Sequence, residues 1–540
     1  MIRDLRALSD NSFDLLVVGA GIYGAAVAWD AAQRGLRVAL IDQGDFGGGT
    51  SANSMKTVHG GVRSLQTGNP AELRTFVRER RALSRIAPHL VHPLPFVVPT
   101  YSGLTRHPLA MQAAFKLYDF LSADRNAQPD GAKHLPPSRR VSREECLALN
   151  PLIASDGVTG GIVWHDCQMY NPDRVVLAFV QSSVDAGAAV GNHLRATGWV
   201  KADDRIAGVS VEDRIGSERF DIQARLVVNA VGPWSSRLLD GLERAHIEGR
   251  PPGLSMAMNL VTRSVTTDHA LGGVADGRFL FVAPWRGVTI LGTSHDPYDG
   301  PGGSPTVRSS DVERFLADAR DAFPQASLSV DDVRLVHRGL LPAADAAGHG
   351  LSKVSLVRDH RDDGVAGLLS VVGVRYTTAR DTAETAVDTA MGILNRAPVG
   401  CRTAETPLHG GAIDDWSRFL AGATAGDESI SPDTRRRLAT SYGTHHQRLL
   451  EGMRREPALT APLSETCPVT TGEILHAVDH EMALRLSDAV LRRTEAGSAG
   501  HPGPQALATA ARLMGDRLGW SADDRAREIS EVEATYRLDD

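Results

Sequence analysis

The sequence predicts a mixed α/β protein that has a discontinuous Rossmann-like domain, an inserted β-rich domain and a C-terminal helical domain. First, residues 15–18 form an apolar run, followed by closely spaced glycines, a helical pattern and a second apolar run over 37–41. This order is typical of the first βαβ unit of a dinucleotide-binding domain. Second, short β-like runs crowd residues 255–296, and third, helical patterns dominate beyond residue 397. The chain has 540 residues, too many for one hydrophobic core, so two or three domains are expected.

Three glycines follow the first apolar run at the spacing G-x-G-x-x-G. Gly19 makes the tight turn, Gly21 lets the backbone approach a pyrophosphate, and Gly24 lets the helix pack closely on the strand. The pyrophosphate is expected at the positive end of the helix dipole. Asp42 ends the second strand, about 20 residues downstream, where a carboxylate accepts hydrogen bonds from ribose hydroxyls. These features together predict a dinucleotide site; the alternative is an ordinary βαβ turn with coincidental glycines.

Two later segments favour a flavin over a nicotinamide. One apolar strand ends at Gly232, where it would lie under an adenine dinucleotide. Another leads into a tight turn at Gly373 and a helix start at Thr377 and Thr378. A helix start near the flavin pyrimidine stabilises negative charge on the reduced ring. Nicotinamide-binding folds are usually contiguous, whereas here the pieces are separated by other material, so the sequence indicates FAD.

These patterns divide the chain into three expected domains. The FAD-binding domain is expected to comprise residues 1–75, 155–235 and 345–396, the substrate or cap domain residues 76–154 and 236–344, and the C-terminal helical domain residues 397–540. In the last of these, Thr470 and Glu473 form a capping box. The apolar residues that follow predict one continuous helix, because they recur at helical spacing: Ile474, Val478, Met482, Leu486 and Val490.

Composition and charge limit the function classes. The net charge of −7 argues against a general nucleic-acid binder. The four cysteines lack metal-ligand spacing, which predicts no metal site and reduced thiols in a cytoplasmic protein. No apolar run approaches the roughly 18 residues needed to span a bilayer, and the charged residues 1–10 lack a signal-peptide core. Peripheral contact with the inner face of the membrane stays open as an alternative.

Six further segments form a set that is more specific than the glycine fingerprint. They are residues 50–63 (TSANSMKTVHGGVR), 229–234 (NAVGPW), 281–285 (FVAPW), 291–294 (LGTS), 357–359 (VRD) and 373–380 (GVRYTTAR). With the helix around residues 477–481, this set resembles the FAD-dependent glycerol-3-phosphate dehydrogenase/oxidase family, within the D-amino-acid-oxidase-like flavoproteins. The resemblance covers nearly the whole chain, from Asp14 to about Trp520.

The resemblance implies roles for particular residues. The flavin would be lined by Thr50, Ser51, Ser54, Lys56, Gly60 and Gly61, together with His59 between them. Arg63, Arg358 and Arg375 would form a cationic substrate pocket. The chemistry agrees with this assignment, because a phosphate monoester carries nearly two negative charges and planar guanidinium groups bind it bidentately. The alternative for each arginine is a solvated residue or a salt bridge.

Two segments depart from the family pattern. Leu341 stands where the family usually has a substrate-facing arginine, and Met258 stands where it has a histidine near the substrate. We therefore expect the pocket to have lost one cation and one proton acceptor and to have gained thioethers. The lysine of the final glycine turn is replaced by Arg375, which keeps the charge.

Oxidation of an alcohol also requires removal of the hydroxyl proton, which needs a base or a dense positive field. His59, His295 and His337 are the candidate bases, because histidine titrates near neutral pH. His59 belongs to the flavin-lining motif, and His295 follows the end of a strand. The alternative for each is a packed or surface histidine.

The leading functional prediction is FAD-dependent oxidation of sn-glycerol 3-phosphate to dihydroxyacetone phosphate, by hydride transfer to flavin N5. Its electrons would pass to a quinone or another acceptor. Three alternatives remain: the same chemistry on another polyol phosphate or hydroxy compound, oxidation of an amine or amino acid, and a flavoprotein without catalytic activity. A homo-oligomer is a further expectation, and no nucleic-acid partner is expected.

Overall fold

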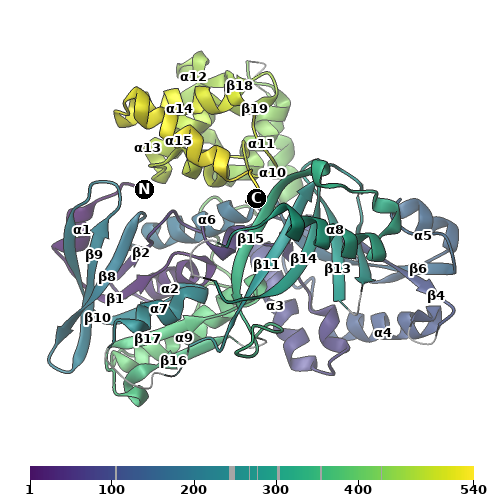
Figure 1. The fold of residues 1–540 in the computed structure, drawn as a ribbon, viewed down its shortest axis with the longest axis horizontal. Helices are drawn as coiled ribbons and strands as arrows, with labels where there is room; N and C mark the ends of the chain where they lie inside the picture. Colours follow the sequence, from purple (N-terminus) through teal and green to yellow (C-terminus); the bar gives the residue numbers. More distant parts are fainter. Residues whose placement is uncertain are drawn as a thin grey trace.

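The computed structural model describes residues 1–103, 106–242, 248, 250–266, 268–275, 278–300, 305–352, 355–426 and 429–539. Two large sheets stand side by side, and a group of helices covers one end of both (Figure 1). Within the described residues, none of the helices is both long and apolar enough to cross a membrane. The predicted fold class is confirmed. The domain boundaries stay a prediction.

The first sheet has eight strands and carries the βαβ unit that the glycines predict. Its main path runs β16-β17-β10-β1-β2-β7, and β9 and β8 extend it beside β10. The pairs along β17-β10-β1-β2-β7 are parallel. The strands are β1 (Ser12–Val18), β2 (Val38–Ile41), β7 (Ala189–Gly191), β8 (Leu194–Ala202), β9 (Arg205–Asp213), β10 (Arg219–Asn229), β16 (Leu356–Asp359) and β17 (Leu368–Val372).

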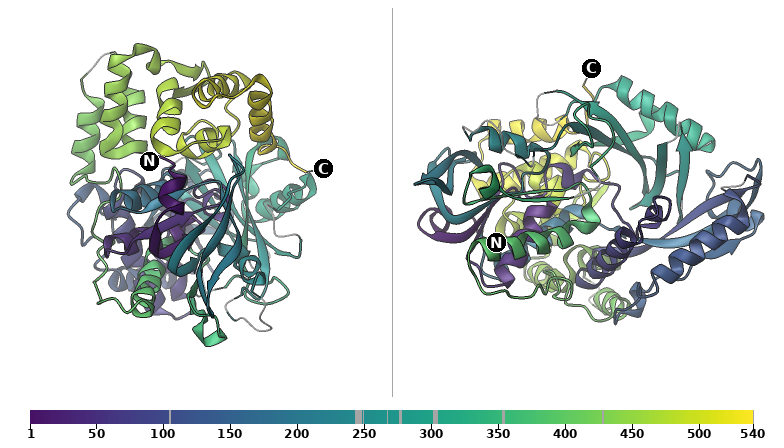
Figure 2. Two further views of the ribbon diagram at one scale, coloured as in Figure 1. Left: turned by 90° about the vertical axis from the view of Figure 1, so that its left-hand side faces the viewer. Right: turned by 90° about the horizontal axis from the view of Figure 1, so that it is seen from below.

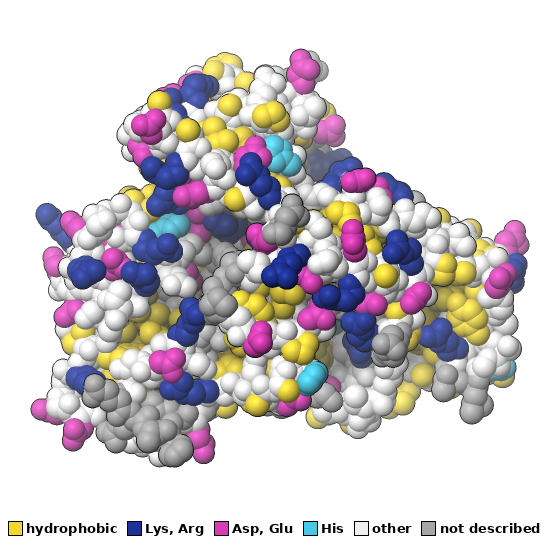
Figure 3. Space-filling model, in the orientation of Figure 1, with side chains coloured by type: hydrophobic (Ala, Val, Ile, Leu, Met, Phe, Trp, Pro, Cys, Tyr) yellow, Lys and Arg dark blue, Asp and Glu magenta, His cyan; other side chains and the backbone are white. Residues whose placement is uncertain are grey.

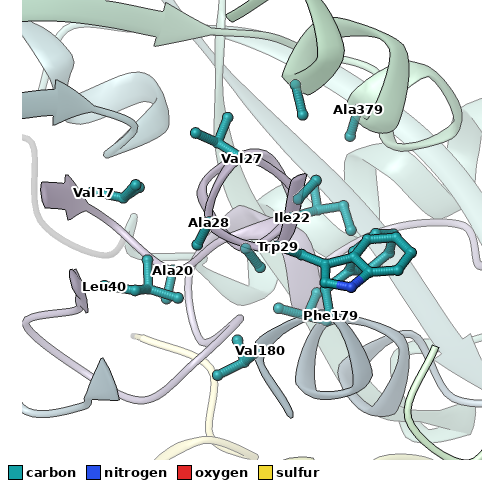
Figure 4. Packing of buried hydrophobic residues seen from close by; sticks show 14 of the residues in the cluster. Val17, Ala20, Ile22, Val27, Ala28, Trp29, Leu40, Phe179, Val180 and Ala379 are labelled. Carbon is teal, nitrogen blue, oxygen red and sulfur yellow. The ribbon is translucent and has the colours of Figure 1, made fainter. Parts of the chain in front are cut away.

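Three helices cover one face of this parallel sheet. They are α2 (Ile22–Gln33), α6 (Pro172–Asp185) and α9 (Ala379–Ile393). Trp29 of α2 meets Phe179 of α6 edge to face, with ring centroids 5.3 Å apart, as Figure 4 shows. Val17 of β1 packs in the same cluster. Because α2 is buried on nearly every side, its position relative to the sheet is rigid, and so is the glycine turn before it.

The second sheet has nine strands and forms the inserted domain. Its path is β15-β11-β14-β13-β12-β4-β6-β3, with β5 beside β6. Helices α3 (Pro70–Ile86), α4 (Pro108–Leu121), α5 (Arg143–Leu149) and α8 (Ser309–Ala322) pack around it (Figure 2). The strands are β3 (Thr57–Val58), β4 (Val91–Tyr101), β5 (Arg139–Val141), β6 (Val158–Met169), β11 (Leu254–Thr262), β12 (Ala270–Ala275), β13 (Arg278–Trp285), β14 (Val288–Tyr298) and β15 (Val333–Pro342).

The C-terminal part is helical, as predicted. It contains α10 (Trp416–Thr424), α11 (Pro432–Tyr442), α12 (His446–Arg455), α13 (Thr471–Glu481), a π-helix over Asp488–Arg493 (η12), α14 (Pro504–Leu518) and α15 (Ala522–Ala534), with a small hairpin of β18 (Pro462–Ser464) and β19 (Cys467–Thr470). These helices sit above α6 in Figure 1. Over the face in that view, basic and acidic side chains are interspersed (Figure 3).

The capping box is present, but the prediction of one helix through Val490 is wrong. Thr470 and Glu473 cap each other, and α13 then ends at Met482, whose φ of 59° is left-handed. The Met482 carbonyl accepts a hydrogen bond from Asn192 of the first domain, 2.9 Å away. Helical structure begins again at Asp488, whose carboxylate accepts hydrogen bonds from the amide N–H groups of residues 484 and 485. Contact with the first domain therefore interrupts a helix that the apolar spacing alone favours.

Candidate functional site

A cavity of about 1810 Å³ lies between the two sheets. It is lined by the carboxyl ends of β1 and β10, the inner face of the second sheet and a part of the C-terminal domain. Pockets for drug-sized ligands are typically about 300–1,000 Å³, so this cavity has room for a dinucleotide together with a small substrate.

The glycine turn leaves a backbone surface at one end of the cavity. Gly19 has a φ of 101°, and a Cβ there would lie 2.6 Å from the Ala230 carbonyl oxygen. A Cβ on Gly24 would overlap the Gly19 carbonyl, which is the close helix–strand packing that the spacing predicts. Gly21 is the N-cap of α2 and has no side chain to cover the helix N-terminus. This end of the cavity therefore fits a pyrophosphate.

Asp42 lines the cavity beyond this turn. Its carboxylate accepts hydrogen bonds from the amide N–H groups of Ala20 (2.7 Å) and Gly44 (2.9 Å). Withdrawal from water raises the pKa of Asp42. Ser51 also lines the cavity and accepts the amide N–H of Ile22, at 3.0 Å. The donors and acceptors at this end fit the adenosine diphosphate half of FAD.

A side chain of α2 holds the final glycine turn. The Tyr23 hydroxyl donates to the Arg375 carbonyl (2.8 Å) and accepts the Arg375 amide (3.1 Å). A Cβ on Gly373 would overlap the Tyr23 ring, so the turn passes as close as glycine allows. Thr377 then accepts the amide N–H of His59, at 3.1 Å. The turn, the first helix and the His59 segment therefore form one connected wall.

The predicted flavin-lining residues fall into two groups. Those that line the cavity are Gly19, Gly21, Asp42, Thr50, Ser51, Ser54, Gly61, Gly232, Gly373 and Thr377; those behind its wall are Gly24, Lys56, Gly60 and Thr378. Lys56 is buried and donates to the Ala52 carbonyl at 2.6 Å, and burial lowers its pKa to about 8. Thr378 lies at the start of α9, 3.5 Å from the Arg375 carbonyl.

Two of the three predicted arginines face the same part of the cavity. Arg63 lies over the Phe279 ring, 4.8 Å from its centroid, and Arg375 pairs with Glu72. Partial desolvation and then the charge of Arg375 lower the pKa of Arg63. Among the described residues, none of the carboxylates lies within ion-pairing distance of Arg63. An unpaired guanidinium beside a second one favours an anion.

Arg358 does not join them. It lies on β16, and its guanidinium contacts Asp363 at 2.7 Å and Glu248 at 3.2 Å. It is not among the residues that line the cavity. Arg358 therefore matches the salt-bridge alternative, and two of the three predicted arginines line the cavity.

His59 faces the cavity next to a buried acid. Its Nδ1 lies 3.6 Å from Asp166, which is 1% exposed. The Asp166 carboxylate also accepts the Gly60 amide at 2.8 Å and pairs with Arg80. Arg80 in turn donates to the Tyr118 hydroxyl at 3.0 Å. A fixed carboxylate behind an imidazole sets which ring nitrogen carries the proton.

His295 lies on β14, also at the cavity wall. Its Nδ1 is buried and has no hydrogen-bond partner in the described part of the chain. Burial lowers its pKa to about 4, and the nearby cations Arg278 and Arg63 contribute to the shift. His337 is different, because it is buried outside the cavity lining and lies 3.2 Å from Asn53. His59 and His295 thus both line the cavity, whereas His337 does not.

The expectation that thioethers replace a pocket histidine is wrong. Met258 is 1% exposed and packs with Met256 in the core on the other face of the sheet. The cavity is lined instead by Ala257 of β11, which lies directly opposite His295 on the neighbouring strand β14. Side chains alternate between faces along a strand, so neighbouring residues point in opposite directions. Leu341 does line the cavity, as expected for a lost arginine.

Several site residues were not predicted. Tyr23 and Asp166 hold other residues in place, and Trp164 lines the cavity with a buried indole N–H that has no partner among the described residues. Asn259 accepts from Thr293 at 2.7 Å and donates to the Asn53 carbonyl at 3.2 Å. Trp164 and Asp166 share one face of β6, which is a usable sequence signal. Their partners are remote, so spacing alone does not reveal them.

Comparison with known proteins agrees with this geometry. The family model described as FAD dependent oxidoreductase matches residues 14–373, two thirds of the chain. This chain belongs to that family. The model described as the C-terminal domain of alpha-glycerophosphate oxidase matches residues 401–525. The family confirms the predicted FAD cofactor, the fold class and the oxidoreductase assignment.

Several relatives match along nearly their whole length. Glycerol-3-phosphate dehydrogenase from Synechocystis is 30% identical, and the match covers 98% of this chain and 97% of the relative. Glycerol-3-phosphate dehydrogenase 1 from Mycobacterium tuberculosis is 31% identical over 92% of this chain and 93% of its own. A crystal structure of the Bacillus halodurans glycerol-3-phosphate dehydrogenase with FAD superposes with a TM-score of 0.78 at 26% identity, covering 98% of this chain and 96% of that one.

Proposed function

We propose that this protein oxidises sn-glycerol 3-phosphate to dihydroxyacetone phosphate. The observation that carries the proposal is the placement of Arg63 and Arg375 on the cavity that also holds the glycine cradle. A phosphate ester bound by the two guanidinium groups would present its carbon chain to the flavin-binding part of the same cavity. The names of the full-length relatives support the same substrate.

Bound FAD supplies a hydride acceptor, N5 of its ring. The carbon atom of the secondary alcohol loses a hydride, the hydroxyl group loses a proton, and a ketone results. Arg63 and Arg375 orient the phosphate. The cation pair also stabilises the negative charge that develops on the alcohol oxygen.

We assign the hydroxyl proton to His295, with His59 as the second candidate. The lowered pKa of about 4 keeps His295 neutral at pH 7, and a neutral imidazole has one ring nitrogen that can accept a proton. A phosphate dianion next to Arg63 offsets the positive charge that disfavours protonation of His295. Substrate binding therefore makes this histidine a stronger base at the moment it is needed.

The test is anaerobic reduction of the bound flavin, followed by its absorbance. Bleaching by glycerol 3-phosphate supports the proposal, and bleaching only by another polyol phosphate or by an amino acid would replace it. If none of these compounds bleaches the flavin, the protein is a non-catalytic flavoprotein. His59→Asn and His295→Asn variants that both keep full turnover would refute the assignment of the proton acceptor.

One observation favours a second substrate. Leu341 lines the cavity where the family pattern has an arginine, and Phe96, Trp164 and Phe281 add an aromatic part to the wall of the same cavity. A less cationic and more apolar pocket fits a polyol phosphate with a larger carbon skeleton. A preference for such a compound over glycerol 3-phosphate in the bleaching assay would select this candidate.

The remaining partners are predictions that follow from the resemblance. A quinone or another acceptor would receive the electrons. Peripheral attachment to the inner face of the membrane and a homo-oligomer belong to the same group. Sedimentation with anionic vesicles and measurement of the molar mass in solution would test the last two.

A further inference from the structure

The C-terminal domain reaches into the cavity beside the adenosine end of the site. Five of its residues line the cavity: Arg485, Ser487, Asp488, Arg492 and Glu531. From the first domain, Asp42, Gly44 and His193 line the same region. The wall at this end therefore comes from two domains that are distant in sequence.

Arg492 joins the two domains through the loop that follows Asp42. Its Nε donates to the Asp45 carboxylate at 2.6 Å, and Arg493 binds the same carboxylate through two N–H groups at 2.6 and 2.7 Å. Asp45 is buried, and these charges hold its pKa well below its usual range. A Cβ on Gly48 would lie 3.8 Å from the Arg492 guanidinium, so the arginine packs on the loop backbone itself.

The ion pairs of Arg492 continue through Asp488 to His193. Arg492 also donates to Asp488 at 2.7 Å, and Asp488 contacts His193 Nε2 at 2.9 Å. The His193 amide donates to the Gly44 carbonyl at 2.8 Å. Asp45, His193 and Asp488 lie close enough to hold a metal ion, but the arginines already balance both carboxylates, so this cluster carries no metal proposal.

One donor of this network is left over. Nε and one terminal nitrogen of Arg492 are used, whereas its Nη1 has no hydrogen-bond partner within the described residues. The side chain lines the cavity and is 14% exposed. A guanidinium held by two buried carboxylates is pre-organised, so a further hydrogen bond to a phosphate costs little side-chain entropy.

We infer that the C-terminal domain is part of the FAD site, and that Arg492 donates a hydrogen bond to the adenosine diphosphate half of the cofactor. The Asp45 network then fixes residues 43–49 against that half. Release of FAD requires these ion pairs to loosen. This inference concerns cofactor retention and is independent of which alcohol is oxidised.

The test measures binding, not turnover. In an Arg492→Gln variant, we expect FAD to bind the full chain at least about 10-fold more weakly, because a charge-assisted hydrogen bond contributes about 10-fold or more to affinity. ADP binding to the apoprotein should weaken by a similar factor, whereas FMN, which lacks the adenosine half, should bind as in the wild type. Arg517→Gln is the matched control, because Arg517 pairs with Asp479 within the same domain.

Two further measurements keep the inference testable if Arg492→Gln folds poorly. The double variant Asp45→Asn/Arg492→Gln removes one buried carboxylate together with one of its cations and should show the same loss of ADP affinity. In the wild-type apoprotein, ADP should slow amide hydrogen exchange over residues 484–493. Unchanged FAD and ADP affinity in the folded variants, equal weakening by Arg517→Gln, or no ADP-dependent protection of this segment would overturn the inference.

Discussion

Replacement of Arg63 by glutamine tests the anion site most directly. Arg63 faces the cavity without a carboxylate partner in the described residues, so its charge is available to the substrate. Losing a bidentate, charge-assisted contact costs about 2–3 kcal/mol, slightly reduced by relief of repulsion with Arg375. At about 1.4 kcal/mol per factor of ten, we expect kcat/KM for glycerol 3-phosphate to fall about 30- to 150-fold.

The assay compares two substrates and two variants. Arg63→Gln should reduce the rate of anaerobic flavin reduction by glycerol 3-phosphate but leave the slow reaction with glycerol, which has no phosphate, nearly unchanged. Arg358→Gln is the matched control, because that arginine lies on β16 and pairs with Asp363. FAD content should stay normal in both. A loss of less than about three-fold in Arg63→Gln, or an equal loss in Arg358→Gln, would refute the two-arginine site.

Four further outcomes are expected. Gly24→Ala should lower the flavin-to-protein absorbance ratio of the purified protein and its stability by about 1–3 kcal/mol, since the new Cβ would overlap the Gly19 carbonyl; a normal ratio would contradict this. Tyr23→Phe should raise KM about five-fold through the Arg375 turn, with unchanged FAD content. His295 is neutral above about pH 4, so activity should fall as pH drops toward that value, and an unchanged acid limb in the residual activity of His295→Asn would argue against His295. Finally, burial lowers the pKa of His476 from 6.5 to about 4, so the folded state binds fewer protons than the unfolded state. The free energy of unfolding should therefore fall by up to about 1.4 kcal/mol per pH unit as the pH drops from 6.5 to 4. An equal slope in His476→Gln would exclude this residue as the cause.

The glycine turn and the acid that follows it were predictable, because both depend only on residues close together in the chain. Gly19, Gly21 and Gly24 follow a buried strand and open a helix, and each is required by backbone geometry over a few residues. Asp42 ends the next strand of the same parallel sheet, so it necessarily lies near the turn. The same holds for Gly373 and Thr377, which follow β17 in that sheet.

The register of β11 determines which of its residues faces the cavity, and motif matching did not show this. The family resemblance placed Met258 in the pocket because it stands where the family has a histidine near the substrate. In β11, however, Ala257 faces the cavity and Met258 faces the core. One position along a strand reverses the face, and no local feature of this segment shows which face is inward. The cross-strand pair of Ala257 with His295 then supplies a histidine from the neighbouring strand.

The sequence alone determined the fold class and the glycine cradle for FAD, because strand–turn–helix geometry is short-range and glycine patterns record it; the family resemblance proposed three arginines, of which two line the cavity. Tertiary structure alone decided that Arg358 is paired elsewhere, that the helix after Glu473 breaks at Met482, and that Arg492 reaches the cofactor cavity. Each of these depends on partners that are remote in the chain. Burial, ion pairing and sheet register arise only when the chain has folded, and no spacing within one segment encodes them.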